Sequence, residues 1–204
     1  MLDTNTPSVA IRDLDLHFGD VKILQKLNLD IQKGEFLVLL GSSGCGKSTL
    51  LNCIAGLLDI TDGQIFIGGE NVTWAQPSER GIGMVFQSYA LYPQMTVEGN
   101  LSFGLKNAKM PKDEIAKRVA RAADVLQIEP LLKRKPGALS GGQRQRVMIA
   151  MALACQPKLL IADEPTTALD VTIQAQILEL MQALQRDLGL AVVLWANWFF
   201  VLPG

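Results

Sequence analysis

Hydrophobic and polar residues alternate along the first thirty positions of the chain. Apolar side chains recur mostly at every second residue on either side of residues 19–20: they are Val9, Ile11, Leu14, Leu16 and Phe18, then Leu27, Leu29 and Ile31. A period of two is typical of strands with one buried face, so we predict two antiparallel strands joined by a turn at Gly19 and Asp20. Residues 64–69 are expected to form another short strand and turn.

Continuous apolar runs indicate buried strands at residues 36–40, 159–165 and 191–194, and a further strand is expected at residues 81–87. Helices are expected between them. One begins at Pro111, one is capped by Ser140 and runs to about residue 154, and a long amphipathic one follows Asp170 and ends at Gly189. This pattern predicts an α/β fold.

Composition narrows the class of protein without identifying it. A chain of 204 residues with 49% apolar and 19% charged residues is typical of one globular domain. The net charge of -1 and the pI near 5.9 give no electrostatic argument for nucleic acid or an anionic membrane surface. Three cysteines without paired spacing, Cys45, Cys53 and Cys155, favour a reducing compartment. The polar, acidic opening is unlike a signal peptide, and no apolar run is long enough to span a bilayer.

A glycine-rich stretch between a predicted strand and a helix has the spacing of a phosphate loop. It comprises Gly41, Ser42, Ser43, Gly44, Cys45, Gly46, Lys47, Ser48 and Thr49. Glycines let successive backbone N–H groups curl around a phosphate, and the helix that begins there points its positive dipole end at it. Lys47 is expected to reach the β- and γ-phosphates, and the Ser48 hydroxyl to bind Mg²⁺. The alternative, a Gly/Ser-rich turn, lacks a reason for the flanking strand and helix.

Two further predicted strands end on polar side chains. The run at 159–165 ends in Asp163 and Glu164, and adjacent acids at the carboxyl edge of a parallel sheet are costly unless they meet a cation or a reacting group. Asp163 suits Mg²⁺, and Glu164 suits a water molecule that attacks phosphorus. Gln87 ends the strand at 81–87 and is expected to contact the metal or water, although a generic loop Gln is the alternative.

The pentapeptide at residues 139–143 predicts a second anion site. Ser140 is placed as the N-cap, and Gly141 and Gly142 leave bare N–H groups at the positive end of a helix, followed by Gln143. An ordinary capped helix is the alternative. Phe18, beside the predicted turn, is by its pattern alone more often a core residue than an exposed ring that stacks on a purine.

The ordered set of phosphate loop, Gln87, residues 139–143, Asp163–Glu164 and residues 168–170 resembles the nucleotide-binding subunit of an ATP-binding cassette (ABC) transporter. The resemblance covers nearly the whole chain. It implies a phosphate-loop NTPase fold with an antiparallel β subdomain and an α-helical subdomain. The expected division is one domain over residues 1–204, with a core at 1–87 and 156–204 and a helical subdomain at about 88–155.

The resemblance also implies ligands and partners. ATP and Mg²⁺ are held between the phosphate loop of one domain and Ser140 to Gln143 of a second, identical or different domain. Phe18 stacks on adenine, Asp170 contacts the partner domain, and Gln87 senses metal and water. A membrane permease docks on the loop that follows Gln87, and a periplasmic or extracellular solute-binding protein acts indirectly. The subunit is expected at the cytoplasmic face of the inner membrane, without nucleic acid.

Two branches of the family are represented. Phrases up to about Arg146, such as residues 77–81 and 85–93, resemble importers of sugars or glycerol phosphate, whereas residues 161–176 resemble oligopeptide importers. A recombinant chain is one hypothesis. The family carries a switch histidine where Asn197 stands here, and Asn cannot carry a positive charge. We also expect the domain to be incomplete after Gly204, and expect the run at 190–202 to lack a surface to pack on.

These observations predict an ATP-binding and ATP-hydrolysing subunit that energises uptake of a solute, with carbohydrate preferred, through a separate permease. The alternative is a catalytically impaired ATP-binding module, or a truncated or chimeric product, because of Asn197. A chromosome-maintenance ATPase is disfavoured, since the interval between Ser48 and Ser140 contains no heptad run for a coiled coil.

Overall fold

The structure, a computed structural model, describes residues 6–41, 46–86, 88, 90–166 and 169–195. Its elements, in chain order, are β1 (Val9–Phe18), β2 (Val21–Ile31), β3 (Phe36–Leu39), α1 (Lys47–Ala55), β4 (Asp62–Ile67), β5 (Glu70–Asn71), β6 (Ile82–Val85), α2 (Val97–Asn107), α3 (Lys112–Val125), α4 (Gly141–Ala154), β7 (Leu159–Asp163), α5 (Val171–Leu188) and β8 (Ala191–Trp195). None of the helices in these ranges is long and apolar enough to cross a membrane.

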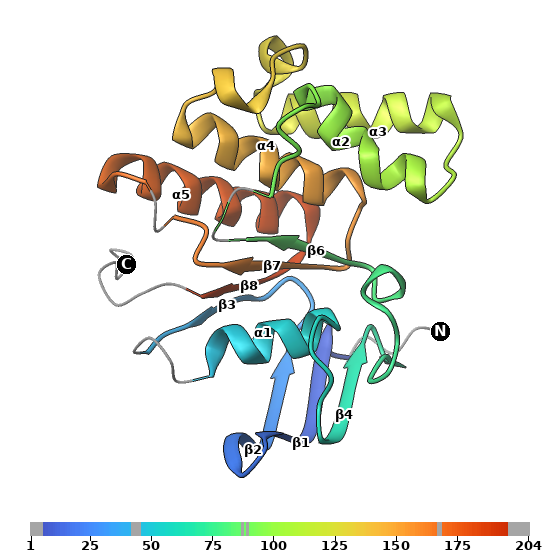
Figure 1. Cartoon of the computed structure of the whole chain (residues 1–204), viewed down its shortest axis with the longest axis vertical. Coiled ribbons are helices and arrows are strands. Elements are labelled where there is room, and N and C mark those ends of the chain that lie inside the picture. The colour runs from blue at the N-terminus through green and yellow to red at the C-terminus, as the bar shows by residue number, and fades with distance from the viewer. Residues whose placement is uncertain (1–5, 42–45, 87, 89, 167–168, 196–204) are drawn as a thin grey trace.

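The strands form two separate sheets (Figure 1). The antiparallel sheet has the order β2-β1-β4-β5, and its first two strands meet at the predicted turn, where Phe18 pairs with Val21. The second sheet has the order β3-β8-β7-β6, and all of its strands are parallel. The predicted α/β fold is therefore confirmed, and parallel strands place their carboxyl ends along one edge.

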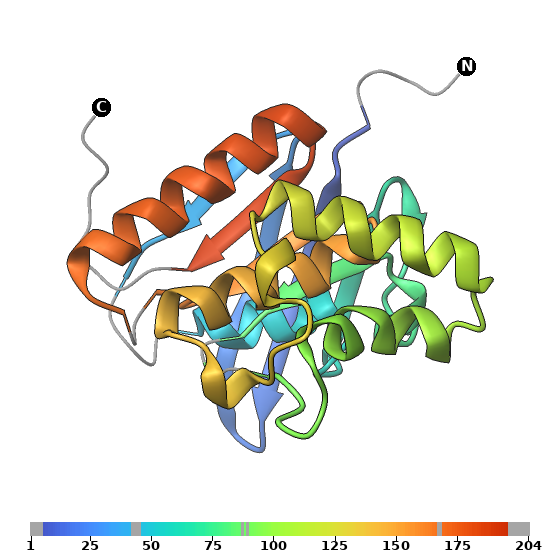
Figure 2. The ribbon, with the colours of Figure 1, turned by 90° about the horizontal axis from the view of Figure 1, so that it is seen from above.

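Helices cover both faces of the parallel sheet. Helix α1 lies between the two sheets, and α4 and α5 lie on the other face, with α5 running along the sheet in both views (Figures 1 and 2). Alternate residues of the two central strands divide between two cores: Ile161 and Val193 pack with α1, whereas Leu160 and Val192 pack with the helical layer. A strand covered on both faces needs a continuous apolar run, which explains the sequences of β7 and β8.

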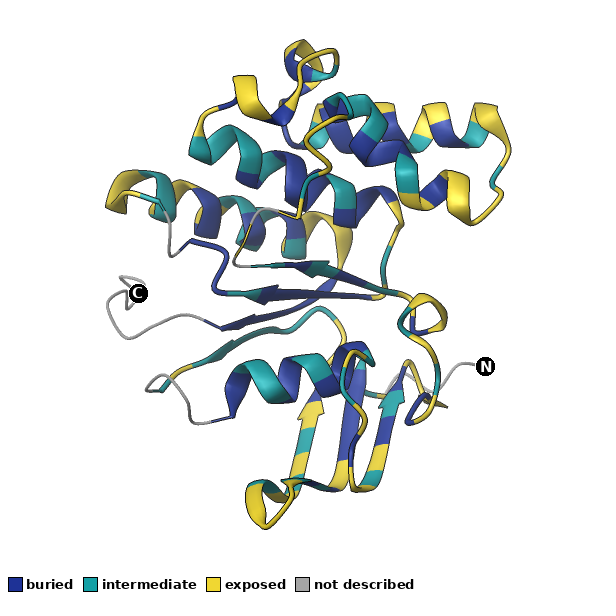
Figure 3. Ribbon diagram, viewed as in Figure 1, coloured by how far each residue is buried: buried dark blue, intermediate teal, exposed yellow. Residues whose placement is uncertain are grey.

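Two sequence expectations about burial are wrong. The run that contains β3 was expected to be buried, but its residues are half-buried and Leu40 is 57% exposed, because β3 is the edge strand of the sheet (Figure 3). The run that begins at Leu190 was expected to lack a packing surface. Its described part is buried instead, since β8 lies between β3 and β7 with helices on both faces. Residues 196–202 lie outside the described part.

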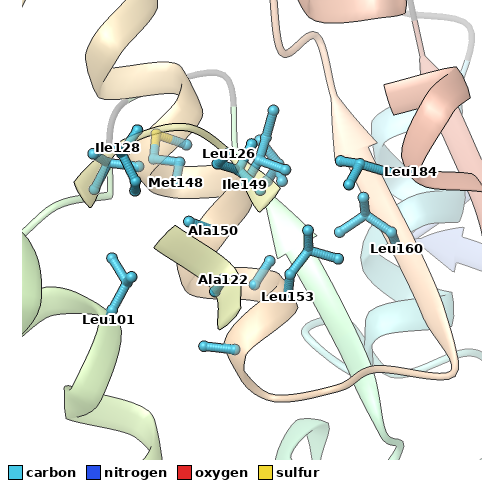
Figure 4. Packing of buried hydrophobic residues seen from close by; sticks show 14 of the residues in the cluster. Leu101, Ala122, Leu126, Ile128, Met148, Ile149, Ala150, Leu153, Leu160 and Leu184 are labelled. Carbon is cyan, nitrogen blue, oxygen red and sulfur yellow. The ribbon is translucent and has the colours of Figure 1, made fainter. Parts of the chain in front are cut away.

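The helical layer is held by an apolar cluster between α2, α3, α4 and the sheet (Figure 4). Leu101 of α2, Ala122 of α3 and Ile149 of α4 meet there. Helix α2 was not predicted from the sequence. Its N-cap is Thr96, whose hydroxyl accepts a hydrogen bond from the Gly99 N–H over 3.1 Å. The boundary between core and helical subdomain stays a prediction.

A buried arginine fastens the carboxyl end of α1 to the segment after β5. The Arg80 guanidinium, 4% exposed, donates to the carbonyls of Cys53 (2.8 Å) and Ile54 (3.0 Å) in the last turn of α1, and to Thr73 and Ala75 (both 3.0 Å). Gly56 leaves room for it, because a Cβ there would lie 2.5 Å from Arg80 Nε. Arg80 thereby adds donors to two carbonyls in the last turn of α1, of which that of Cys53 also accepts the Gly56 N–H over 3.1 Å.

Candidate functional site

The amino end of α1 points at the carboxyl edge of the parallel sheet. Gly46, the residue before Lys47, has a left-handed backbone with φ +89°, which favours glycine. The antiparallel sheet also approaches closely here, since a Cβ on Gly46 would lie 3.4 Å from Ile23 and Leu24 side chains of β2. The first N–H groups of α1 have no partner within the helix and offer a site for an anion.

Most of the predicted phosphate loop precedes this helix. Gly41 follows β3 with a positive φ of 148°, and Lys47, Ser48 and Thr49 form the first turn of α1. Ser42, Ser43, Gly44 and Cys45 lie outside the described residues, so the path of the loop between Gly41 and Gly46 stays a prediction.

The structure brings Ser48 and Asp163 together. The Ser48 hydroxyl donates a hydrogen bond to Asp163 Oδ1 over 3.1 Å, which joins the first turn of α1 to the end of β7. Hydroxyl and carboxylate oxygens are suited to Mg²⁺, which proteins commonly bind through one or two such ligands together with phosphate oxygens and water. Within the described residues no three His, Cys, Asp or Glu side chains cluster. This donor set fits a metal that arrives with a phosphate ligand.

Lys47 lies over the last residue of β8. Its Nζ is 5.1 Å from the centre of the Trp195 ring, a distance typical of a cation–π contact, and the residue is only 9% exposed. The ammonium group is therefore held at the carboxyl edge of the sheet, beside the start of α1. Trp195 was not singled out from the sequence, because its place in an apolar run marks it only as a core residue.

Glu164 follows Asp163 in a strained conformation. It is 6% exposed, and its φ of +47° is uncommon for a residue other than glycine. Its N–H donates to the Trp195 carbonyl over 3.1 Å, which holds the turn at the end of β7 against β8. Backbone strain of this kind clusters at functional sites. Gln87, the other predicted catalytic residue, lies outside the described part of the chain.

A glutamine that sequence analysis missed supports the segment after Glu164. Asp170 caps α5 by accepting a hydrogen bond from the Ile173 N–H over 3.1 Å, as predicted. Gln174 Nε2 then donates to the carbonyls of Thr166 (2.9 Å) and Leu169 (2.8 Å). These bonds tie Thr166 and Leu169 to α5. A glutamine in the first turns of an amphipathic helix carries no signal that reveals this role.

The predicted second anion site lies on a different face of the sheet from α1. Ser140 caps α4, and its hydroxyl accepts from the Gln143 N–H (3.3 Å) while the Gln143 side chain accepts from the Ser140 N–H (3.0 Å). A Cβ on Gly142 would lie 3.0 Å from Ile173 Cγ2, so Gly141 and Gly142 begin a helix packed against the start of α5. Figure 1 shows α4 and α1 on opposite faces of the parallel sheet. The described structure therefore presents two distinct helix ends.

Phe18 stands at the tip of the hairpin between β1 and β2. It is 51% exposed, and Val21, its neighbour across the turn, is 61% exposed. The interpretation of Phe18 as a core residue is thus wrong. The alternation of apolar and polar residues continues to the end of β1, but the covered part of the sheet ends before Phe18. Its ring is accessible to a ligand.

A parallel sheet whose carboxyl edge carries a helix-borne lysine and serine beside two acids defines a phosphate-loop nucleotide-binding domain. A family model described as "ABC transporter" matches residues 24–167, and the chain belongs to this family. The resemblance stated from the motifs is confirmed, as is the predicted fold class.

Proteins similar to this chain are import ATP-binding proteins. The maltose/maltodextrin import ATP-binding protein MalK of Vibrio vulnificus is 52% identical over 186 residues, which cover 91% of this chain and 50% of that protein. The sn-glycerol-3-phosphate import ATP-binding protein UgpC 3 of Rhizobium etli is 51% identical, with 88% and 52% covered. This chain spans about half the length of these relatives.

A solved structure shares the fold. The bacterial ABC transporter cassette MJ0796, described as dimeric, has a TM-score of 0.80 and 33% identity over 92% of this chain and 87% of that one. The MalK match also bears on the two predicted branches of the family. An alignment of 186 residues in a chain of 204 extends well past Val147, where the second branch was predicted to begin. The second segment therefore also aligns with a sugar importer, and recombination stays a hypothesis.

Proposed function

We propose that this chain is the ATP-binding and ATP-hydrolysing subunit of an ABC importer that energises uptake of a carbohydrate through a separate permease. The observation that carries the proposal is the contact between Ser48 and Asp163. It places a phosphate-loop hydroxyl and an acidic strand end at one point, next to the Lys47 ammonium and the buried Glu164. A metal-bound triphosphate needs this combination of cation, metal ligands and nearby carboxylate.

In this proposal each residue at the sheet edge has a role toward ATP. The N–H groups of the phosphate loop from Gly41 to Thr49 cradle the phosphates, and Lys47 neutralises charge on the β- and γ-phosphates. Ser48, Asp163 and Gln87 hold Mg²⁺, which when bound neutralises charge that develops on the phosphate oxygens. Glu164 orients the attacking water and takes its proton. Phe18 stacks on the adenine ring.

The second helix end suits a second nucleotide-binding domain. Ser140 to Gln143 begin α4, which lies on the opposite face of the sheet from α1, so their proposed role is to serve the nucleotide of a partner domain rather than their own. Gly142 packs on Ile173 near Asp170, which puts both predicted partner-facing segments side by side. The dimeric description of MJ0796 supports this arrangement.

The permease is proposed to dock beside the loop that follows Gln87. A groove of about 760 Å³ lies between α2 and α3, where Val119 and Ile115 form an apolar wall. Tyr92 of the neighbouring loop is 45% exposed, and its ring lies 4.6 Å from that of Phe103. The proposed occupant of this surface is a helix of a membrane permease, and the subunit is proposed to lie peripherally at the cytoplasmic face of the inner membrane. A solute-binding protein acts through the permease.

The proposed solute class rests on relatives. MalK and UgpC 3 are described as acting in import of maltose or maltodextrin and of sn-glycerol-3-phosphate, and each is at least 51% identical to this chain. We therefore propose a sugar or related carbohydrate.

A second candidate function is an ATP-binding module with slow turnover. It is favoured by Asn197, which the motif match aligns with the switch histidine and which lies outside the described residues. Loss of one preorganised contact to the reacting phosphate lowers the rate by roughly 10²- to 10³-fold.

Steady-state ATP hydrolysis and ATP binding by the purified chain test these proposals together. We expect Glu164→Gln to bind ATP and to hydrolyse it at least about 100-fold more slowly than the unsubstituted chain. Glu179→Gln makes the same chemical change on the exposed side of α5 and is expected to be neutral. The second candidate, an ATP-binding module with slow turnover, is selected by two results together. The unsubstituted chain binds ATP but hydrolyses it no faster than Glu164→Gln, and Asn197→His increases the rate of hydrolysis. Absence of ATP binding overturns both.

A further inference from the structure

A cavity of about 200 Å³ lies where the helical layer meets the amino ends of two central strands. Its lining comes from the second half of α3, from the end of α4 with the turn that follows it, and from the junction between α5 and β8. The turn after α4 leads into β7, so the cavity is at the opposite end of this strand from Asp163 and its partner Ser48. It is therefore separate from the proposed ATP site.

Most of the cavity wall is apolar. Ala122 of α3, Leu153 and Ala154 of α4, and Leu190 before β8 line it, and all four are buried. Figure 4 shows Ala122 and Leu153 next to each other in the apolar cluster of the helical layer. The cavity volume corresponds to about seven water molecules at ~30 Å³ each. Because an apolar wall offers water few hydrogen bonds, an apolar group of similar size is favoured there.

Two arginines one turn apart on α3 give this cavity a positive charge, and no acidic residue is part of its lining. Arg118 Nε donates to Glu114 Oε1 over 2.8 Å, which orients the guanidinium. Within the described residues, the terminal nitrogens of Arg118 make no hydrogen bond or ion pair, and neither does the Arg121 guanidinium. A guanidinium with open N–H groups matches the geometry of a carboxylate.

An alternative role for the two arginines is to cap helix ends. Helices α4 and α5 both end beside the cavity, and carbonyls at the carboxyl end of a helix attract cations. Neither arginine donates to these carbonyls in the described structure. Backbone groups close the helix ends instead: the Gln156 N–H donates to the Leu153 carbonyl over 2.8 Å, and Gly189 ends α5. The remaining donors of the arginines are thus available to a ligand.

We propose that this cavity binds a small monocarboxylic acid with an aliphatic body, with the body against the apolar wall and the carboxylate at Arg118 and Arg121. Inorganic phosphate lacks the apolar body, and an aliphatic alcohol lacks the charge. The inference goes beyond the proposed function and does not depend on it, since none of the residues that line the cavity belongs to the proposed ATP site.

Methyl NMR spectroscopy of the full chain, labelled at leucine, tests the proposal with hexanoate as the probe. We expect hexanoate to shift the methyl signals of Leu153, Leu188 and Leu190 with a Kd of about 1 mM or tighter. The Leu14 signal, from the other core, serves as the reference and should not move.

Two further ligands separate the charge from the apolar body. Hexan-1-ol has the same length without the charge and should bind at least about tenfold more weakly than hexanoate. Inorganic phosphate should shift none of the three cavity signals. The proposal is overturned if hexanoate shows no saturation by about 10 mM, if hexan-1-ol binds as tightly, or if phosphate shifts the same signals.

Substitutions on α3 then test the arginines. Arg118→Gln and Arg121→Gln should each weaken hexanoate binding by about fivefold and leave hexan-1-ol binding unchanged, because only the carboxylate contact is lost. Lys117→Gln removes a charge from an exposed position of α3 outside the cavity lining and is the control. Undiminished hexanoate binding by the double arginine variant overturns the proposal, as does an equal loss in Lys117→Gln. Thermal unfolding checks that each variant folds; if one does not, the ligand comparison on the unsubstituted chain decides.

Discussion

The Ser48 hydroxyl donates a hydrogen bond to the Asp163 carboxylate over 3.1 Å, although the residues are 115 positions apart in the chain. Ser48 lies in the first turn of α1, and Asp163 ends β7. The phosphate-loop helix and the acidic strand end are therefore in direct contact. Two oxygens already in contact need little rearrangement to share one Mg²⁺.

Replacing Ser48 by Ala should separate metal-dependent from metal-independent nucleotide binding. We expect hydrolysis to fall by about 10- to 100-fold and Mg²⁺-dependent ATP affinity to fall with it, because one of the two oxygens is lost. ATP affinity measured in EDTA should change little. Ser102→Ala removes a helical serine hydroxyl in α2, bonded to the Gly99 carbonyl, and serves as the control. Equal loss of affinity with and without Mg²⁺ would contradict this role.

The Gln174 side chain should be needed for rapid ATP hydrolysis, because its NH₂ group donates hydrogen bonds to two backbone carbonyls. Gln174→Glu replaces the NH₂ group that bonds the Thr166 and Leu169 carbonyls with oxygens that repel them at pH 8. We expect hydrolysis to fall by about tenfold or more, since Thr166 and Leu169 lose these bonds and the backbone close to Glu164 shifts. Gln176→Glu makes the same change at an exposed position of α5. Similar rates for the two variants would show that turnover does not depend on the Gln174 bonds to Thr166 and Leu169.

Arg80 should contribute strongly to stability. Arg80→Ala removes one donor from each of four carbonyl oxygens, two of them at the end of α1, and in the described structure only that of Cys53 keeps another donor, the Gly56 N–H. We expect the free energy of unfolding to fall by about 3 kcal/mol. Arg118→Ala breaks a surface pair with Glu114 and should cost less than about 1 kcal/mol. Urea unfolding of both variants checks this. A smaller loss for Arg80→Ala than for Arg118→Ala would exclude the proposed anchoring.

Cys53 should make stability depend on pH in the alkaline range. Burial raises the pKa of its thiol from 9.0 to about 11. Because the folded pKa is raised, the contribution of the thiol is fully present below pH 9 and is lost as pH rises from 9 to 11. The stability of the unsubstituted chain relative to Cys53→Ala should therefore decrease by up to about 2 kcal/mol over this range. Chemical unfolding at each pH measures it, and parallel pH profiles would refute the assignment.

Local pattern predicted most elements because their signals are short-range. The alternation before residue 31, the apolar runs of β7 and β8, and the caps Ser140 and Asp170 all appear in the structure as expected. The helix α2 was missed, since residues 88–95 before it have no periodicity and its cap at Thr96 carries only a weak signal. Burial at β3 was misjudged because an apolar run does not reveal whether its strand lies at a sheet edge.

By itself the sequence determined which chemistry is available: a glycine-rich loop with Lys47 and Ser48, paired acids at a strand end, and a capped second helix end. These follow from residue types at fixed spacing, which act through local backbone geometry. Only the tertiary structure decided which groups meet. The Ser48–Asp163 bond, the Trp195 ring under Lys47 and the Arg80 anchor join segments far apart in the chain, and their distances depend on strand order and helix packing. Pairing between β3, β8 and β7 brings the Ser48–Asp163 and Lys47–Trp195 contacts to one edge, which no local pattern encodes.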